Sequence, residues 1–252
     1  RSGYCFLKGE LTMSRVSIVV PFFNCQYIHY ALDSLLNQTY NDIEIIVVND
    51  GSTQYKEKIV PYLNKVIYIE KENGGTASAL NMGIQQATGD YICWLSSDDV
   101  YYPQKIALQL EFMQLHNSFF SHTNYYAINT KGNIITPPIG FHPSSKLEIL
   151  KQMSKGNIIN GCSTMINKNV FNYVGLFDET LLYTHDYELW VRIIQKFDLH
   201  YLSEPLLLSR IHENMGTKKY APFIKEENKI VVSRHKDVMT KLISECIGKE
   251  NL

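Results

Sequence analysis

The chain has 252 residues, of which 45% are hydrophobic and 19% are charged, as is typical of a globular protein with a buried core. Its 24 basic and 25 acidic residues nearly cancel, so the composition indicates neither a nucleic-acid-binding surface nor a polybasic membrane anchor. No apolar run approaches the roughly 20 residues that a membrane-spanning helix needs.

The five cysteines are odd in number and widely spaced, and no pair has the spacing of a zinc site or a redox motif. Cys93 lies in an apolar run and is expected in the core. This pattern of cysteines predicts a reducing, intracellular compartment, and a cytoplasmic location is expected. Residues 1–12 lack the apolar segment of a secretory signal. Because Met13 directly precedes the first predicted strand, residues 1–12 are interpreted as a leader that is either added to the natural chain or disordered.

The first half of the chain alternates between predicted strands and helices. Apolar runs bounded by turn residues predict strands at 16–20, 43–48, 66–69 and 91–95. Apolar residues at helical spacing predict helices at 28–36, at about 52–63, at 77–87 and after Pro103. Pro21 is expected to end the first strand, and Asn24 is the expected N-cap of the first helix. This alternation predicts an α/β protein with a right-handed, Rossmann-like, mostly parallel sheet and helices on both faces.

The second half is less regular. It predicts strands at 119–128, 163–167 and 206–211, a hairpin turn at 129–133, and helices at 146–153, 187–197 and about 222–247. Packing onto its own domain is the simplest interpretation of the last helix. A homodimer contact or a peripheral membrane contact stays open.

Two adjacent carboxylates, Asp98 and Asp99, follow the fourth predicted strand. They are therefore expected at the carboxyl edge of the sheet, where open α/β sheets bind ligands. Because neighbouring carboxylates repel each other, a divalent cation that carries a phosphate would explain their placement. The alternative is that Asp98 caps a turn and that Asp99 is solvated.

Three further loops end at the same edge if the sheet is parallel. Residues 21–24, 49–52 and 73–76 each follow an inner strand, and the two glycines of the last loop permit a ligand to approach the backbone closely. Each loop alone is an ordinary turn, but together with residues 96–99 they would form a crevice of amides and carboxylates. No G-x-G-x-x-G follows the first strand and no G-K-[ST] occurs, which disfavours a nicotinamide dehydrogenase and an ordinary kinase.

These segments also carry a family resemblance. The matching stretches are 16–24, 44–53, 72–75 with Ser78 and Asn81, 94–99 with Pro103, 175–179, 185–190 and 210–212. In this combination and order the chain resembles glycosyltransferase family 2, a group of inverting nucleotide-sugar enzymes with a GT-A fold, over residues 16–214. It departs from the family pattern at Ser96, where aspartate is common, at Leu80, where arginine is common, and at His185, where glutamate is common.

The resemblance implies roles for particular residues. Nucleotide binding is implied for the residues at the strand ends, which are Pro21, Phe23, Asn24, Asp50, Asn73, Gly74 and Asp98, with Asp50 accepting a hydrogen bond from uracil N3–H. Ligation of Mn²⁺ or Mg²⁺ is implied for Asp99, Asp98 and His212. Asp186 is the implied general base, and its neighbour His185 is expected to tune it or to touch the acceptor.

Asp186 and His212 have structural interpretations as well. Asp186 stands at the start of a predicted helix, where a cap would stabilise the helix by about 1 kcal/mol. Such a capped carboxylate has a lowered pKa and is a weaker base. A lone histidine such as His212 is more often structural than a ligand.

The resemblance thus implies a metal-dependent hexosyl- or hexosaminyltransferase that uses a nucleotide sugar, with UDP as the expected nucleotide, and a glycan or lipid-linked acceptor. It implies a donor half at 13–117, an acceptor half of the same domain at 118–220 and a helical tail at 221–252. The expected role is cell-surface polysaccharide biosynthesis at the inner face of the membrane. A nucleotidyltransferase and a non-catalytic nucleotide- or glycan-binding subunit stay open, the latter because of the substitutions at Ser96 and Leu80.

Overall fold

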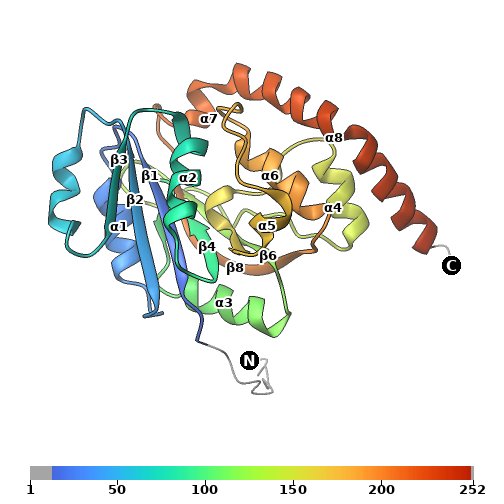
Figure 1. Cartoon of the computed structure of the whole chain (residues 1–252), viewed down its shortest axis with the longest axis horizontal. Helices are drawn as coiled ribbons and strands as arrows, with labels where there is room; N and C mark the ends of the chain where they lie inside the picture. The colour runs from blue at the N-terminus through green and yellow to red at the C-terminus, as the bar shows by residue number, and fades with distance from the viewer. Residues whose placement is uncertain (1–12, 251–252) are drawn as a thin grey trace.

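One eight-stranded sheet runs through the protein in the order β3-β2-β1-β4-β7-β6-β8-β5 (Figure 1). The computed structural model describes residues 13–250, and the interpretation of residues 1–12 as a leader lies outside these described residues. The strands are β1 Val16–Phe22, β2 Ile43–Asp50, β3 Ile67–Lys71, β4 Tyr91–Trp94, β5 Val100–Tyr101, β6 Phe120–Ile128, β7 Met165–Asn167 and β8 Leu199–Arg210.

Helices cover both faces of this sheet, as the sequence predicts. They are α1 Ile28–Leu36, α2 Gly75–Gln86, α3 Lys105–Leu115, α4 Lys146–Met153, α5 Val170–Val174, α6 His185–Ile194, α7 Gly216–Lys219 and α8 Ala221–Glu250. Short 3₁₀ turns lie at Lys56–Lys58, Val60–Tyr62 and Gly161–Ser163. Helices α1 and α3 pack on one face of the sheet, and α2, α4 and α6 pack on the other.

The predicted, mostly parallel character of the sheet is confirmed. β1 pairs in parallel with both β2 and β4, and β2 pairs in parallel with β3. β7 is antiparallel to β4 and β6, and β5 is antiparallel to β8. Alternate side chains of β1 enter opposite cores: Val19 packs in the core under α2, and Ile18 and Val20 pack in the core under α1. Burial on both faces explains why the inner strands are continuous apolar runs.

Pro21 does not end the first strand, which continues to Phe22. The backbone N–H of Val16 donates toward the β2 side, and N–H groups point to alternate sides along a strand. The missing N–H of Pro21 therefore faces the β4 side, where the pairing has already stopped at Val19. A proline fits there because no ladder hydrogen bond is lost.

Two local predictions in the loops after β1 and β2 are wrong. The helix expected at 52–63 is replaced by two 3₁₀ turns. Tyr55 has a left-handed backbone with φ of 62°, and Pro61 lacks an N–H, so a continuous α-helix cannot form there. Asn24 is not the N-cap of α1, because the helix begins at Ile28 with Tyr27 in the cap position.

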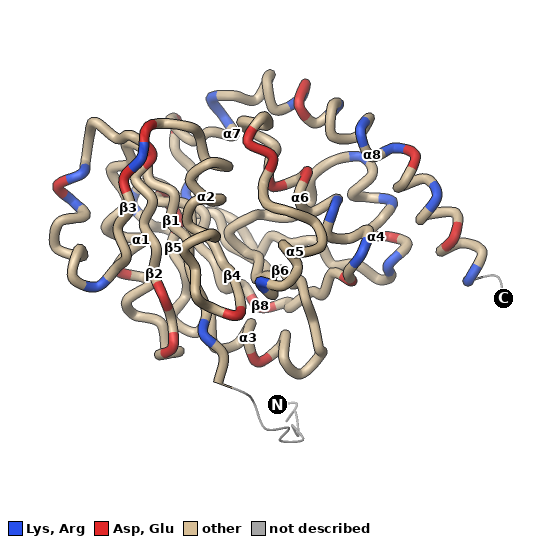
Figure 2. The backbone as a smooth tube through the Cα atoms, in the orientation of Figure 1, with Lys and Arg blue, Asp and Glu red and all other residues tan. Residues whose placement is uncertain are grey.

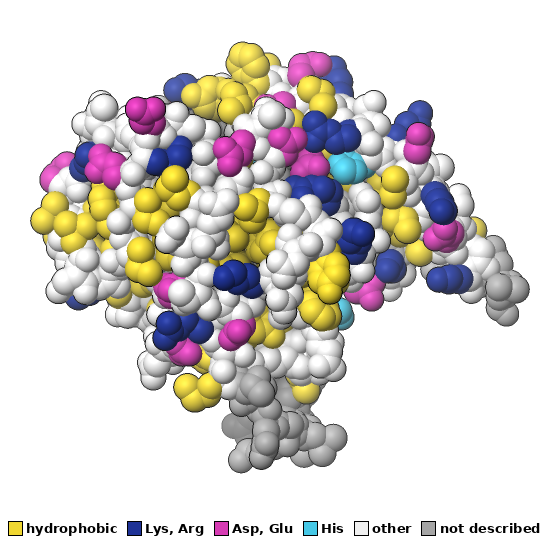
Figure 3. Space-filling view, in the orientation of Figure 1, with side chains coloured by type: hydrophobic (Ala, Val, Ile, Leu, Met, Phe, Trp, Pro, Cys, Tyr) yellow, Lys and Arg dark blue, Asp and Glu magenta, His cyan; other side chains and the backbone are white. Residues whose placement is uncertain are grey.

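Helix α8 lies across the outer side of α4 and α6 (Figure 1). Val231 and Met239 are buried and anchor it to the core, and the predicted helical tail is confirmed. Basic and acidic residues are mixed along its length (Figure 2), and its visible surface carries side chains of both signs (Figure 3). Among the residues described, no helix combines the length and the apolar character needed to cross a bilayer.

Candidate active site

Acidic residues lie along the edge of the molecule where β2 and β3 end and where the segment before α6 passes (Figure 2). This is the carboxyl edge of the parallel strands, as the sequence predicts.

Asp50 ends β2, and its carboxylate is bonded to the N-terminus of α2. Oδ1 accepts hydrogen bonds from Lys71 Nζ at 2.8 Å and from the backbone N–H of Gly74 at 2.9 Å, and Oδ2 accepts one from the N–H of Gly75 at 2.8 Å. The side chain is only 4% exposed. Three of about four acceptor positions of the carboxylate are therefore used inside the protein, and its contact with uracil stays a prediction.

Asn24 connects the loop after β1 to the loop after β2. Its backbone is left-handed, with φ of 48°, and its side-chain oxygen accepts from the N–H groups of Thr53 and Gln54, both at 2.8 Å. The neighbouring Phe23 exposes about half of its surface, whereas Pro21 is partly buried. Phe23 therefore offers an exposed ring at this edge, and Asn24 holds the loop that presents it.

The turn after β3 is tied to the turn after β2. Gly51 has a left-handed backbone with φ of 72°, and a Cβ there would lie 2.8 Å from the backbone nitrogen of Asn73. The side-chain amide of Asn73 donates to the carbonyl oxygen of Asp50 at 2.9 Å. Only glycine permits this approach. It leaves Asn73 and Gly74 exposed at this edge of the sheet.

The two adjacent carboxylates point in different directions. Asp98 Oδ2 lies 2.9 Å from His212 Nε2, and both side chains are partly exposed. Asp99 is buried, and its Oδ1 accepts from the backbone N–H of Arg210 at 2.8 Å. Burial, together with the charge of Asp98, raises the pKa of Asp99 to about 8. Asp99 is thus not solvated, and its raised pKa shifts it toward the uncharged, protonated form, which does not repel Asp98.

Arg210 fixes the Asp98–Asp99 turn, a role that sequence reasoning did not assign. Its Nε donates to the carbonyl oxygen of Asp98 at 2.9 Å, while its backbone N–H bonds Asp99. Its guanidinium lies over the ring of Tyr27, 4.7 Å from the centroid, and the residue is 3% exposed. The available signal in the sequence was an arginine within the predicted strand 206–211. An arginine that is buried there needs hydrogen-bond partners, which the Asp98–Asp99 turn provides.

The positions of Asp98 and His212 fit a divalent cation that both side chains would bind, together with oxygens of a bound ligand or water. Neighbouring ligands of an octahedral ion, each about 2.1 Å from it, lie about 3 Å apart, close to the observed 2.9 Å. Carboxylate oxygen suits Mg²⁺ and Mn²⁺, and imidazole nitrogen is a ligand of first-row transition metals. Within residues 13–250 no cluster of three or more potential ligands exists, so donor oxygens or water would complete the shell.

Asp186 is the second residue of α6, and its carboxylate is held on both sides. Oδ2 accepts from the side-chain amide of Asn157 at 2.9 Å, and Oδ1 accepts from the backbone N–H of Tyr187 at 2.7 Å. Burial raises the pKa of Asp186, so the lowered pKa expected for a capping carboxylate is wrong. The cap position belongs to Thr184 instead. Sequence reasoning also missed Asn157, which lies 29 positions away.

His185 is a core residue. It is 6% exposed, and its ring packs edge-on against the rings of Trp94 and Phe177, at centroid distances of 5.9 and 5.7 Å. Burial lowers the pKa of His185, which favours the neutral imidazole. Because its ring is enclosed by aromatic side chains, its contact with an acceptor stays a prediction.

The segment that carries His185 and Asp186 lies at the same edge as the loop between β3 and α2. Trp94, which packs on His185, is the last residue of β4. Leu182 Cδ2 lies 3.8 Å from the position that a Cβ on Gly75 would occupy, at the first turn of α2. The fold therefore brings the proposed base segment beside the turn that bonds Asp50.

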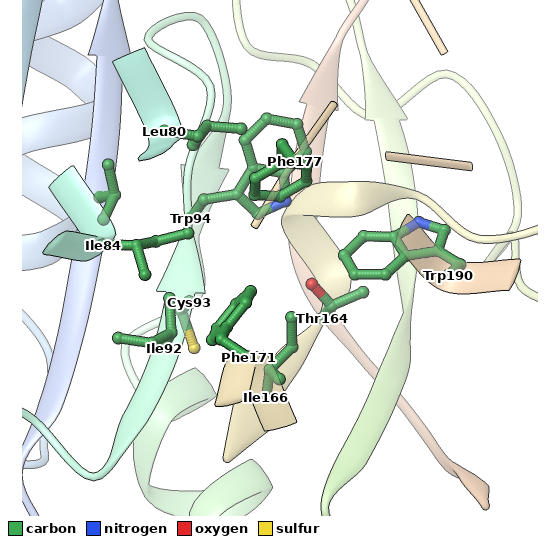
Figure 4. Close-up of a pocket in the computed structure, with 11 residues that line it drawn as sticks. Leu80, Ile84, Ile92, Cys93, Trp94, Thr164, Ile166, Phe171, Phe177 and Trp190 are labelled. Carbon is green, nitrogen blue, oxygen red and sulfur yellow. The ribbon is translucent and has the colours of Figure 1, made fainter. Parts of the chain in front are cut away.

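A small cavity beneath this segment is apolar. Trp94, Phe177, Leu80 and Trp190 line it, and Thr164 is its polar lining residue (Figure 4). Without a charged lining it cannot hold a diphosphate. Leu80 is fully buried here, so the position where the family commonly has arginine is a core position in this chain.

Asn81 ties α2 to the segment that leads to Asp186. Its amide donates to the Phe177 carbonyl at 2.9 Å and to Glu179 at 2.8 Å, and its oxygen accepts from the Phe177 N–H at 2.9 Å.

Replacing Asn81 by alanine should lower the free energy of unfolding by about 1–3 kcal/mol, because buried backbone groups lose their partners. Urea denaturation measures this change. The exposed Gln85 on the same helix is the control, and equal midpoints for Gln85→Ala and Asn81→Ala would contradict the prediction.

Residues 17–175 match the model of a protein family described as "Glycosyl transferase family 2". An uncharacterized glycosyltransferase of Rickettsia prowazekii is 41% identical over 217 residues, which cover 84% of this chain and 68% of that protein. The Escherichia coli UDP-Glc:alpha-D-GlcNAc-diphosphoundecaprenol beta-1,3-glucosyltransferase WfaP is 32% identical over 190 residues, which cover 73% of this chain and 72% of WfaP.

Two solved structures have a similar fold. Staphylococcus aureus TarS in complex with UDP has a TM-score of 0.65 at 21% identity, covering 79% of this chain and 61% of that one. The mannosyltransferase PcManGT from Pyrobaculum calidifontis, in complex with GDP-Man and Mn²⁺, has a TM-score of 0.65 at 15% identity, covering 92% of this chain and 66% of that one. The predicted GT-A fold is confirmed. The chain spans 37% of a longer TarS structure and 37% of a Rickettsia felis relative.

Proposed function

The chain belongs to glycosyltransferase family 2, and on this premise we propose that it transfers a hexosyl or hexosaminyl group from a UDP-sugar to an acceptor hydroxyl, with inversion. The observation that carries the proposal is the meeting of three features at one sheet edge. They are the Asp50 turn, the Asp98–His212 pair and the partly buried, hydrogen-bonded carboxylate of Asp186. UDP is proposed because WfaP is named for UDP-Glc and because TarS was solved with UDP.

The donor would lie across the loops after β1, β2 and β3. The exposed ring of Phe23 is suited to stack on the base, beside Pro21, Asn24 and Asp50. Asn73 and Gly74, exposed at the N-terminus of α2, are suited to the ribose and the diphosphate. Residues 13–117 would therefore form the donor half of the domain, and residues 118–220 the acceptor half.

Asp98 and His212 would hold Mn²⁺ or Mg²⁺ against the diphosphate, and the ion would supply Lewis-acid stabilisation of the leaving group. Asp98 could also accept a hydrogen bond from the ribose, because its side chain is partly exposed. Asp99, also predicted as a ligand, would in this proposal hold the turn through Arg210.

Asp186 would accept the proton of the acceptor hydroxyl at Oδ2. As the acceptor oxygen bonds to the sugar C1, the bond from C1 to the diphosphate oxygen breaks, and UDP departs on the opposite face. Asn157 orients the carboxylate by its hydrogen bond. The raised pKa of Asp186 makes it a stronger base than an exposed aspartate, closer to the range in which general bases work best.

The acceptor would be a glycan or a lipid-linked saccharide in cell-surface polysaccharide assembly. WfaP is named for transfer to alpha-D-GlcNAc-diphosphoundecaprenol, which is a lipid-linked saccharide, and this name supports the proposed acceptor class. A peripheral contact at the inner face of the membrane would follow from a lipid-linked acceptor.

A thermal-unfolding panel tests the donor site directly. We expect UDP with Mn²⁺, at 100 times its Kd, to stabilise the protein by about 2.7 kcal/mol, a shift in Tm of about 5 °C or more. GDP, dTDP and CDP are the comparison nucleotides, and UDP with EDTA is the control for the metal. A shift with another nucleotide would replace UDP in the proposal, and no shift with any nucleotide would favour a non-catalytic subunit.

A further inference from the structure

We propose that Glu227, on the C-terminal helix α8, is a positioning residue that holds the segment bearing Asp186 in its catalytic place. This inference rests on the proposed function, in which Asp186 is the general base. Glu227 lies 41 positions after Asp186, and neither the family resemblance, which ends at residue 214, nor the family match over 17–175 includes it.

Four donors converge on the Glu227 carboxylate. The backbone N–H of Leu182 donates to Oε1 at 3.0 Å, and the N–H groups of Tyr183 and Thr184 donate to Oε2, both at 2.9 Å. The Thr184 hydroxyl donates to Oε2 at 3.0 Å. Three successive amides of one loop are thus bound by one side chain from a distant helix, and Asp186 follows two residues later.

The Thr184 hydroxyl faces Glu227 and makes no capping bond to its own helix. Thr184 is the N-cap of α6, a position where threonine usually accepts from a backbone N–H. Glu227 instead places a carboxylate beside the first turn of α6, where the helix dipole favours negative charge. Because charge-assisted hydrogen bonds are about twice as strong as neutral ones, this set restrains the loop more than ordinary turn contacts would.

The restrained loop contacts α2, which belongs to the proposed donor half of the protein. Leu182 packs at the first turn of α2, and Asn81 holds the loop's beginning at Phe177. At its end, Asn157 bonds Asp186 itself. Glu227 bonds the stretch between these two anchors, so that stretch depends on α8 for its position.

Helix α8 is fixed firmly enough to act as such a support. Val231 and Met239 are buried against the core. Arg234 pairs with Asp178 at 2.8 Å, one turn along the helix from the buried Val231. The helix lies across α6 (Figure 1), and its position determines where the Glu227 carboxylate meets the loop.

The test compares Glu227→Gln with Glu226→Gln in the full chain. A glutamine offers one acceptor oxygen in place of two and has no charge, so the loop loses part of its support. We expect E227Q to lower kcat about 10- to 100-fold, as small misplacements of catalytic groups do, with the Kd for UDP unchanged. Glu226 is exposed and pairs with Lys229 on the same helix, so E226Q should retain wild-type kcat.

A double variant separates positioning from general weakening of the fold. If Glu227 acts through Asp186, then Asp186→Asn combined with E227Q should be no slower than D186N alone. A further loss equal to that of E227Q would overturn the inference, as would an E227Q enzyme as active as E226Q. If D186N itself keeps full turnover, the proposed function fails instead, so the two failures are distinguishable.

Hydrogen exchange of the wild-type protein gives a result even if E227Q does not fold. The amides of Leu182, Tyr183 and Thr184 should exchange as slowly as those inside α6. Exchange at the rate of a free loop would show that Glu227 does not bind these amides in solution, and the inference would be wrong.

Discussion

Replacing Asp186 by asparagine is expected to lower kcat about 10³-fold, within the 10²- to 10⁴-fold range of general-base catalysis, while the Kd for UDP stays the same. Asparagine is isosteric but has one acceptor oxygen, so it keeps one of the two bonds, to the Asn157 amide or to the Tyr187 N–H. The bonds from Glu227 to the preceding amides are unchanged, so the loop should keep its shape. It cannot take up the acceptor proton. Initial-rate kinetics with UDP-sugar and acceptor, together with a UDP-binding isotherm, measure both quantities.

Asp237 provides the matched control, because it is an exposed aspartate on α8. Asp237→Asn should leave kcat unchanged.

The pH dependence of kcat for the wild-type enzyme gives an independent check. A base must be deprotonated to work, and the pKa of Asp186 is raised by burial, so kcat should fall with decreasing pH at a higher pH than an exposed aspartate would give. A D186N enzyme with wild-type kcat would remove Asp186 from the mechanism.

The sequence predicts the first half of the chain well because burial leaves a strong pattern there. β1, β2 and β4 are covered on both faces, so most of their residues are apolar and the strands are easy to recognise. β8 is different. It spans Leu199–Arg210, but its first part is half-exposed and includes Pro205, and its register with β6 shifts near Asn124. Residues 206–211 look like a strand in the sequence because apolar residues predominate there and Leu206 and Leu207 are buried.

Polar residues at the sheet edge were expected to face a ligand, and several of them bond the protein instead. Asn24 bonds the amides of the next loop, Asp50 bonds the start of α2, and Asp99 bonds Arg210. Buried polar groups must have partners, and a crevice built from loops needs many of them. Sequence alone cannot divide such residues between loop support and ligand binding, because both uses call for the same side chains at the same positions.

The contacts that the sequence could not indicate are those between distant segments. Asn157 lies in the loop after α4 and Glu227 lies on α8, and neither belongs to a recognisable motif, yet both bond the segment around Asp186. Their partners are set by how that loop and α8 lie against the start of α6, which no local pattern records. Arg210 differs, because it lies within a recognised stretch but bonds a turn 111 residues earlier.

Removing the Asp98 side chain is expected to have the other large effect. Asp98→Ala takes away one of two proposed ligands, and loss of the Lewis acid removes several kcal/mol of transition-state stabilisation, so kcat/KM should fall about 10²- to 10⁴-fold. The Mn²⁺-dependent part of the UDP thermal shift should disappear with it. EDTA should inactivate the wild type to a similar extent, and added Mn²⁺ should restore it.

Asp198 is the control for this substitution, since it lies directly before β8 whereas His212 follows the strand's other end. It forms an exposed ion pair with Lys146, and Asp198→Asn should change neither the activity nor the metal response. His212→Ala separates two geometries. If Asp98 and His212 share an ion, H212A should raise the Mn²⁺ concentration that gives half-maximal activity. If H212A needs no more Mn²⁺ than the wild type, the 2.9 Å contact is a structural hydrogen bond, and the ion must be held by Asp98 and the diphosphate without the imidazole.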